Sequence, residues 1–282
     1  MKIQRMLAAL WLGVVLAAAH AAPPGRIGIA LGSGSMHAFA HIGVLQELEA
    51  HGIQPAVVAG TSAGAIVGSL YASGMPPNEI AALMRDADWP SARRLFLSRN
   101  GFFSNAPVRE RLETAFAGRP IESWPRRFGA VATHVTDGAR RLLATGDGAL
   151  AVQASSAMPV AFVPVVVGNE MLVDGALVEP TPVQAARDLG ADFVIAVDVA
   201  YRPSEGEASG MTDLGFQAIH ILVNNLAAMQ LPSADVTIRI DVHAAFSKDG
   251  SAGTIAAGRE AVRRAWPEIA GALTRAERRA AR

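Results

Sequence analysis

Two short apolar runs near the start of the chain constrain its fold more than any other feature. The first run, Arg26–Leu31, stops at Gly32–Ser35 and leads into a stretch with helical spacing of apolar residues. The second run, Ala56–Ala59, stops at Gly60–Gly64, and the helix expected after it has no polar face, which indicates burial on all sides. Strands that alternate with helices in this way predict a parallel sheet covered by helices.

The remainder of the chain continues the mixed pattern. The region from Ser73 to Phe116 is mostly helical in pattern, and Thr181 with Pro182 has the form of a helix start in which Thr181 is the N-cap. Further strands are expected over residues 128–135, 140–144, 165–167, 171–173, 192–199 and 235–242, and further helices over 147–157, 212–230 and the basic C-terminal stretch. No internal repeat and no second domain is indicated, so residues 26–282 are expected to form one domain.

Composition excludes several classes of protein. The 282 residues are 51% hydrophobic, enough for a sizeable core, and Lys+Arg and Asp+Glu balance at 25 each. A balanced charge gives no reason to expect nucleic acid as a partner. The absence of cysteine excludes disulfides, a thiolate metal site and a cysteine nucleophile. No group of His and acidic residues has metal-site spacing, so we expect neither a metal nor another cofactor.

The first 21 residues have the pattern of a signal peptide. Lys2 and Arg5 precede an uncharged apolar run, Met6–Ala19, and Ala19–Ala21 has the small-x-small form of a cleavage site. We therefore expect export to the periplasm or beyond, with cleavage after Ala21. The alternative is an uncleaved anchor, for which the apolar run is short.

The stretch Gly60–Gly64 has the form of a nucleophile elbow around Ser62. A serine hydroxyl is a weak nucleophile, so it needs a base, and the oxyanion that forms needs hydrogen-bond donors. A base candidate is Asp174, where an apolar strand ends at Asp174-Gly175-Ala176. The backbone N–H groups of Gly32–Met36 are expected at the same end of the sheet, because both turns leave the carboxyl ends of parallel strands.

Three ordered blocks resemble one known family. They are Leu31–Leu45 with its glycine-rich turn, the elbow Gly60-Thr61-Ser62-Ala63-Gly64, and Ala154–Pro159 followed by Val173–Ala176. Together they resemble the patatin-like phospholipases, in particular the compact bacterial members, over about residues 26–199. The resemblance implies a three-layer α/β/α fold with a mainly parallel central sheet and a Ser62–Asp174 dyad without histidine. It also implies hydrolysis of lipid acyl esters, with an oxyanion hole formed by Gly32, Ser33, Gly34, Ser35 and Met36.

The chain departs from the family's pattern at three positions. His37 stands where the family usually has arginine or lysine, Ala38 where it has glycine, and Glu179 where it has asparagine. A histidine is mostly neutral near pH 7 and replaces a fixed cation, and an alanine at positive φ is strained. We therefore expect an active site that is weaker or differently selective.

Two other functional interpretations remain open from the sequence. A Ser-His-Asp triad could use His243, which follows an expected strand, with Asp174 or Asp198 as its acid. A catalytically inactive relative that binds lipid or a protein partner would also fit the departures at His37 and Ala38. For membrane contact the sequence offers the region from Ser73 to Phe116, with its clusters Arg93–Leu97 and Gly101–Phe103, although short helices packed on the sheet are favoured there. It also offers the basic C-terminal stretch from Thr254 onward, for which a closing helix with a solvated basic face is favoured. The oligomeric state is not indicated.

Overall fold

A computed structural model of the chain describes residues 26–86, 94–98, 101–199 and 210–281. The expected signal peptide, residues 1–21, lies outside the described residues, as do residues 87–93 and 99–100 of the region that the sequence offered for membrane contact. Within the described residues, no helix has the length and apolar character needed to cross a membrane.

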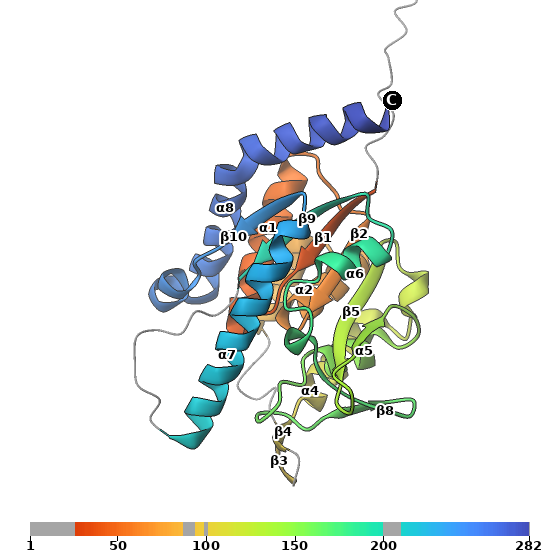
Figure 1. Cartoon of the computed structure of the whole chain (residues 1–282), viewed down its shortest axis with the longest axis vertical. Helices are drawn as coiled ribbons and strands as arrows, with labels where there is room; N and C mark the ends of the chain where they lie inside the picture. The colour runs from red at the N-terminus through yellow and green to blue at the C-terminus, as the bar shows by residue number, and fades with distance from the viewer. Residues whose placement is uncertain (1–25, 87–93, 99–100, 200–209, 282) are drawn as a thin grey trace, which may run out of the picture.

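An eight-stranded sheet with the order β10-β9-β1-β2-β5-β8-β7 forms the centre of the molecule, and β6 pairs with β5 (Figure 1). Five of its strands are parallel to one another, and β6, β7 and β8 pair antiparallel at one side. The strands are β1 (Ile27–Leu31), β2 (Val57–Thr61), β5 (Arg127–His134), β6 (Arg140–Leu143), β7 (Val165–Val167), β8 (Glu170–Asp174), β9 (Phe193–Asp198) and β10 (Val236–Arg239). The predicted mixed fold with a mainly parallel sheet is confirmed.

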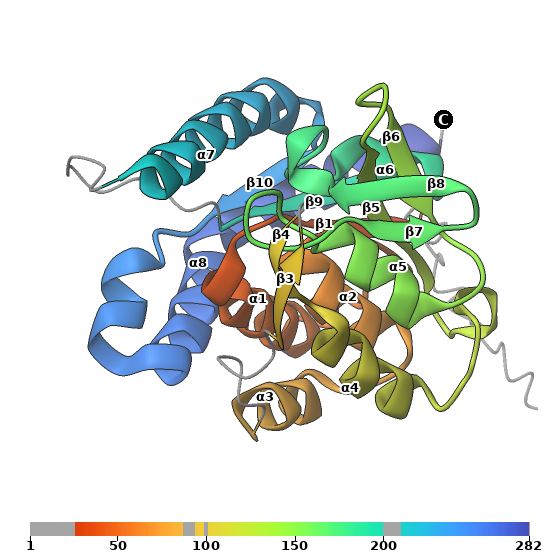
Figure 2. The ribbon, with the colours of Figure 1, turned by 90° about the horizontal axis from the view of Figure 1, so that it is seen from below.

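Helices cover both faces of this sheet (Figures 1 and 2). One face carries α1 (Ala38–Ala50), α2 (Ala63–Ala72), α5 (Gly148–Ser155) and α8 (His243–Ala280), with α3 (Pro77–Asp86) and α4 (Ala106–Phe116) packed outside them. The other face carries α6 (Val183–Asp188) and α7 (Met211–Gln230). Successive side chains of β1 point to opposite faces of the sheet and so contribute to the cores on both faces. Ile29 and Leu31 pack with α1 and α2, and Ala30 packs with α6.

The C-terminal helix α8 packs closely against α1. A Cβ atom on Gly43 would overlap the carbonyl oxygen of Ile255, and one on Gly258 would overlap that of Ala40, so only glycine allows this approach. Arg263 of α8 also donates two hydrogen bonds to the Glu47 carboxylate, at 2.8 and 3.0 Å. The basic C-terminal stretch is therefore packed on the protein, as the favoured interpretation predicted.

Two local expectations were wrong. The region from Ser73 to Phe116 contains a hairpin of β3 (Arg94–Ser98) and β4 (Gly101–Ser104) as well as helices, because tertiary context outweighed its helical pattern. Thr181 does not cap α6, which begins at Val183. Instead the Glu179 carboxylate accepts a hydrogen bond from the backbone N–H of Ala185 at 3.0 Å, so an acidic side chain satisfies this helix start.

The carboxyl ends of the parallel strands lie together at the lower end of Figure 1. Strand register pairs Leu31 with both Gly60 and Val197, so β1, β2 and β9 finish within one residue of the same level. Thr61 pairs with Val131, and β5 continues three residues further, to His134. The turns that follow β1 and β2 therefore meet at this edge, which we call the carboxyl end of the sheet.

Candidate active site

Ser62 occupies a strained turn between β2 and α2. Its backbone has φ 54° and ψ −118°, in the positive-φ region that residues with side chains rarely adopt. A Cβ atom on Gly60 would lie 2.5 Å from the Cα of Ala65, and one on Gly64 would overlap the carbonyl oxygen of Leu31. The two glycines are thus required by close backbone approach, and they bring α2 against the end of β1.

The Ser62 hydroxyl donates a hydrogen bond of 2.7 Å to Oδ2 of Asp174. Asp174 ends β8 and is fully buried, and its Oδ1 accepts the backbone N–H of Ala176 at 2.9 Å. The backbone of Asp174 is also fixed, because its N–H donates to Ala157 and its carbonyl accepts from the Thr133 hydroxyl. The structure therefore brings together the two residues that the sequence suggested as nucleophile and base.

Burial raises the pKa of Asp174 from 3.8 to about 7, against the opposing effect of the hydrogen bonds from Ser62 and Ala176. In the described part of the chain no cationic side chain contacts this carboxyl group. A carboxylate with a pKa near neutrality is a far stronger base than an ordinary aspartate and is still ionised to a useful extent at pH 7. The geometry and the pKa together suit proton abstraction from Ser62.

Fewer backbone N–H groups of the glycine-rich turn are free to bind an oxyanion than the sequence suggested. The N–H groups of Gly32 and Ser33 are engaged by the carbonyls of Val197 and Pro180, at 3.0 and 2.8 Å. These two residues therefore position the turn and do not offer free donors. The N–H groups of Gly34, Ser35 and Met36 find no acceptor among the described residues, and neither does that of Ala63, the first residue of α2.

Two histidines of the first block support this turn. His41 is buried in α1, its Nε2–H donates to the Gly32 carbonyl at 2.8 Å, and burial lowers its pKa to about 4, so it is neutral. His37 is buried as well, and its Nδ1–H donates to the carbonyl of Val199 at 3.1 Å. Ala38 has helical φ −46° and ψ −35°, so it carries none of the strain that a positive φ would impose on an alanine. The turn is held by hydrogen bonds instead of a fixed cation.

Ser155 contacts the nucleophile in a way that sequence reasoning missed. Its Oγ accepts the backbone N–H of Ser62 at 3.0 Å, and the side chain is fully buried near the end of α5. The contact satisfies an N–H group that the strained turn would otherwise leave unpaired. The only signal for it was that Ser155 lies within one of the three blocks, at 93 residues from Ser62 in the chain.

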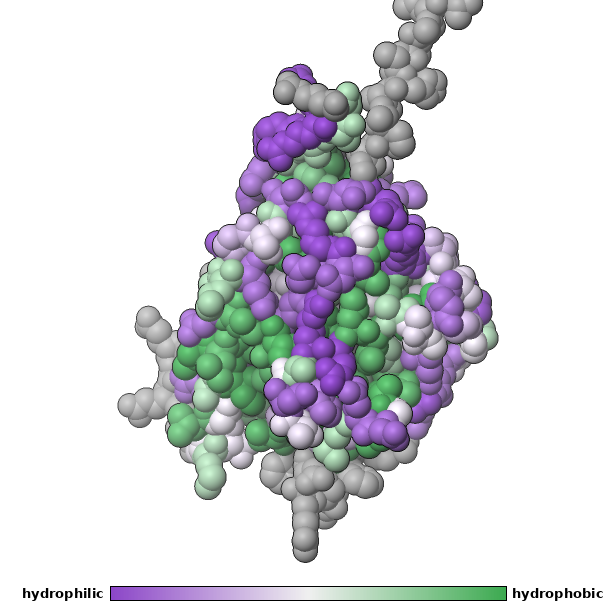
Figure 3. Space-filling model, turned by 45° about the vertical axis from the view of Figure 1, so that its right-hand side comes forward, coloured by the Kyte–Doolittle hydropathy of each residue, from purple (hydrophilic) through white to green (hydrophobic). Residues whose placement is uncertain are grey.

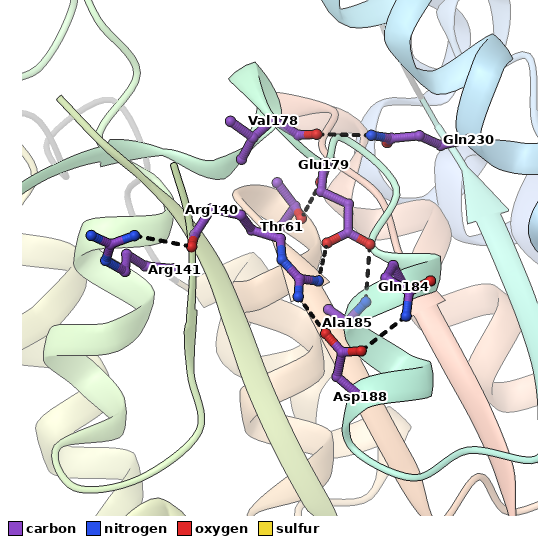
Figure 4. A network of polar contacts seen from close by, with 9 residues as sticks. All are labelled: Thr61, Arg140, Arg141, Val178, Glu179, Gln184, Ala185, Asp188 and Gln230. Atoms are coloured by element: carbon purple, nitrogen blue, oxygen red, sulfur yellow. Dashed lines mark hydrogen bonds and ion pairs between the residues drawn. The ribbon is translucent and has the colours of Figure 1, made fainter. Parts of the chain in front are cut away.

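Glu179, the third departure from the expected pattern, belongs to a buried ion pair beside the site (Figure 4). Its carboxylate accepts a hydrogen bond of 2.8 Å from Arg140, whose guanidinium also pairs with Asp188. The backbone carbonyl of Glu179 accepts the hydroxyl of Thr61 at 2.8 Å, one residue before the nucleophile. The ion pair thus anchors a backbone that touches the elbow directly.

The segment that follows Asp174 therefore links every part of the site. Pro180, which follows Glu179, supplies the carbonyl that accepts the backbone N–H of Ser33. The carbonyl of Val178 accepts a hydrogen bond from the side chain of Gln230 at the end of α7 (Figure 4). Gly175 lies so close to β5 that a Cβ atom would overlap the carbonyl oxygen of Val131. Base, elbow and glycine-rich turn are joined through one short length of backbone.

The triad alternative finds little support in this topology. His243 is the first residue of α8 and follows β10, which lies at the edge of the sheet with β9 and β1 between it and β2. Three strand spacings place β10 roughly 14 Å from β2. Among the described residues, neither Ser62 nor Asp174 has a histidine as hydrogen-bond partner.

Comparison with known proteins decides the family. The model of the family described as patatin-like phospholipase matches residues 29–187, more than half of the chain, including Ser62 and Asp174. The chain belongs to the patatin-like phospholipase family. The resemblance noted in the sequence is thereby confirmed.

Similarity to individual family members is moderate. An uncharacterized NTE family protein of Mycobacterium bovis is 31% identical over 177 residues, which cover 62% of this chain and 49% of the relative. The lysophospholipase NTE1 of Debaryomyces hansenii is 27% identical over 179 residues, covering 61% of this chain and 12% of the relative. The match therefore spans about half of the length of the first relative and a much smaller share of the length of the second.

A solved structure supports the fold. VipD from Legionella pneumophila superposes with a TM-score of 0.53 at 15% sequence identity, covering 86% of this chain and 67% of VipD. At this level of identity the likeness concerns the α/β architecture alone.

Proposed function

We propose that this patatin-like protein hydrolyses acyl esters of lipids, of the phospholipid or lysophospholipid class, with Ser62 as nucleophile and Asp174 as general base. The observation that carries the proposal is the 2.7 Å hydrogen bond from the Ser62 hydroxyl to a fully buried, uncompensated carboxylate. The family match and the name lysophospholipase printed for a relative support the lipid ester as substrate class.

In the first half-reaction, Asp174 takes the proton of Ser62 as its Oγ attacks the ester carbonyl carbon. The carbonyl oxygen becomes an oxyanion, for which the N–H groups of Gly34, Ser35, Met36 and Ala63 are the available donors. Collapse of this tetrahedral intermediate breaks the bond to the alcohol oxygen. That oxygen receives the proton from Asp174, and the acyl group stays on Ser62.

In the second half-reaction a water molecule attacks the acyl-enzyme. Asp174 takes one proton from this water, and the new tetrahedral intermediate expels Ser62, which recovers that proton. The products are a fatty acid and an alcohol, and the enzyme is restored. No histidine is required, because the raised pKa of Asp174 allows it to hold the proton between the two steps.

The proposal is tested by incubating the protein with a mixed lipid extract and identifying the products by mass spectrometry. Release of fatty acid together with the matching lysophospholipid or glycerophosphodiester is expected, and Ser62→Ala is the control that should release neither. Equal release by wild type and Ser62→Ala would overturn the proposed nucleophile. Absence of release from every lipid class, with no fluorophosphonate labelling at Ser62, would favour the inactive lipid-binding relative.

A further inference from the structure

Large apolar side chains exposed to solvent gather at the carboxyl end of the sheet, where Ser62 lies. Eleven such side chains occur among the described residues, and only Leu83 lies apart from both this end and α7. Seven of them come from segments at or beyond this end and from the first turns of α7, and we call these seven the apolar rim: Met36, Val135, Val160, Val166, Met171, Met211 and Leu214.

Strand register explains how separate parts of the chain contribute to the rim. Met36 lies in the turn after β1, beside the backbone donors described above. Val135 follows the last residue of β5, and its N–H donates to the carbonyl of Met171 at 2.9 Å. Met171 in turn pairs with Val166 across the β7–β8 hairpin, so these three side chains occupy one edge just beyond the end of β5.

Val160 shows that exposure at the rim is maintained at a cost. Its φ is 72°, which is unfavourable for any β-branched residue, and its side chain is nevertheless exposed. The adjacent carbonyl of Ala161 accepts the backbone N–H of Phe103, which fixes this turn against β4. Strain of this kind persists where the surrounding structure imposes it, commonly at functional sites.

Helix α7 adds its first turns to the rim at one side of the molecule, at the lower left of Figure 1. Its first turns carry Met211, with 89% of its surface exposed, and Leu214, with 61% exposed, and the helix contains one charged residue, Asp213. Exposed apolar residues recur at helical spacing along its outer side, whereas only Val223 and Ala227 are buried. Figure 3 shows this apolar area over α7, reaching toward the lower end beside a polar stripe.

We propose that the apolar rim docks on an electrically neutral or zwitterionic lipid surface and thereby places the mouth of the site against the substrate. The choice of lipid as partner rests on the proposed function. The exposed apolar side chains come from several separate segments, which suits a broad surface better than a single groove, and docking on such a surface would bury their apolar area. Among the described side chains beside the rim, the cation of Arg141 is paired with the carboxylate of Glu170, so the charges described there supply no excess of cations for anionic head groups.

A site-resolved probe tests this proposal on the full chain. Because the protein has no cysteine, Met211→Cys and Met229→Cys each provide one thiol for an environment-sensitive fluorophore. Both positions are highly exposed on the same helix, and 18 residues of α-helix separate them by about 27 Å. Phosphatidylcholine vesicles should shift the emission of the probe at position 211 to the blue and allow quenching by bromine-labelled acyl chains, and they should leave the probe at 229 unchanged.

Equal responses at both positions, or none at 211, would overturn the docking face. A change at either position that depends on protein concentration without vesicles would show that a second copy of the chain covers α7, and would also overturn it. Turnover of a soluble short-chain ester by the same labelled proteins separates the two proposals. Turnover without a response at 211 removes the docking face alone, and a response at 211 without turnover removes the proposed hydrolysis alone.

Discussion

Asp174 and Glu179 lie five residues apart on one segment, are both buried, and have opposite surroundings. Asp174 faces a serine hydroxyl and one backbone N–H, and burial raises its pKa to about 7. Glu179 faces the guanidinium of Arg140 and the start of α6. The fold thus leaves Asp174, the base that we propose, without a counter-charge, and it neutralises Glu179, whose backbone contacts the elbow.

The largest expected effect comes from removing the base. Asp174→Asn keeps the shape and the hydrogen bond from Ala176 but cannot accept the proton of Ser62. We expect kcat for ester hydrolysis to fall about 10³-fold with little change in KM. Glu179→Gln is the matched control from the other side of the comparison and should lose far less. Similar losses in the two variants would mean that Asp174 acts only through structure.

The same substitution should stabilise the folded protein at high pH. Asp174 has a raised pKa in the folded state, so between pH 4 and pH 7 the folded protein binds a proton that the unfolded chain does not. The free energy of unfolding therefore falls by roughly 4 kcal/mol as pH rises through this window. Asp174→Asn should abolish that fall and be the more stable protein at pH 8. Denaturant unfolding at pH 4 and pH 8 measures this, and a variant that is less stable at pH 8 would contradict the assigned environment.

Breaking the ion pair of Glu179 should lower the stability of the folded protein, whereas Asp174→Asn should raise it at high pH. Arg140→Met leaves a buried carboxylate without its cation, which we expect to cost about 2–3 kcal/mol of unfolding free energy, since the arginine is partly exposed. Arg141→Met, which removes the neighbouring and more exposed pair with Glu170, should lower the stability far less, because solvent screens that pair. Thermal unfolding of both variants makes the comparison. Equal costs would show that the buried pair has no special role.

Ser155→Ala should affect turnover by a smaller amount. It removes the acceptor for the N–H of Ser62, and we expect kcat to fall about tenfold because the strained turn loses part of its support. Ser156→Ala is the control, since the hydroxyl of Ser156 donates to backbone carbonyls of α5 and does not contact Ser62. A KM change without a kcat change in Ser155→Ala would argue against a positioning role.

The smallest effect is expected at His37. The structure shows this side chain donating to the carbonyl of Val199, a hydrogen bond that an arginine can also donate. His37→Arg should therefore preserve or raise ester turnover. Complete loss of activity in a folded variant would show that the neutral ring itself is needed.

The sequence was sufficient for the first half of the architecture because its information is local. Apolar runs ended by small residues located β1 and β2, and the elbow around Ser62 needs glycines that are visible in the sequence. Long-range partners were not predictable. Arg140 lies 39 residues from Glu179, and the carbonyls that engage Gly32 and Ser33 come from Val197 and Pro180.

The hairpin of β3 and β4 escaped prediction for a related reason. Beyond their pairing with each other, its strands make one described bridge, between Phe103 and the distant Phe162, and their segment has a helical distribution of apolar residues. That Glu179, and not Thr181, accepts a hydrogen bond from the start of α6 likewise depends on a chain path that no local pattern encodes. Sequence patterns thus predicted the elements and the dyad, and tertiary contacts determined what supports them.

The most direct test of the Ser62–Asp174 dyad is the pH dependence of fluorophosphonate labelling, followed by intact-protein mass spectrometry. In the wild type the labelling rate at Ser62 should rise as pH increases through about 7, because the base must be ionised. In Asp174→Asn labelling should be slow and independent of pH over the same range. Labelling of Asp174→Asn at the wild-type rate, or an unchanged pH profile, would contradict the assignment of Asp174 as the base.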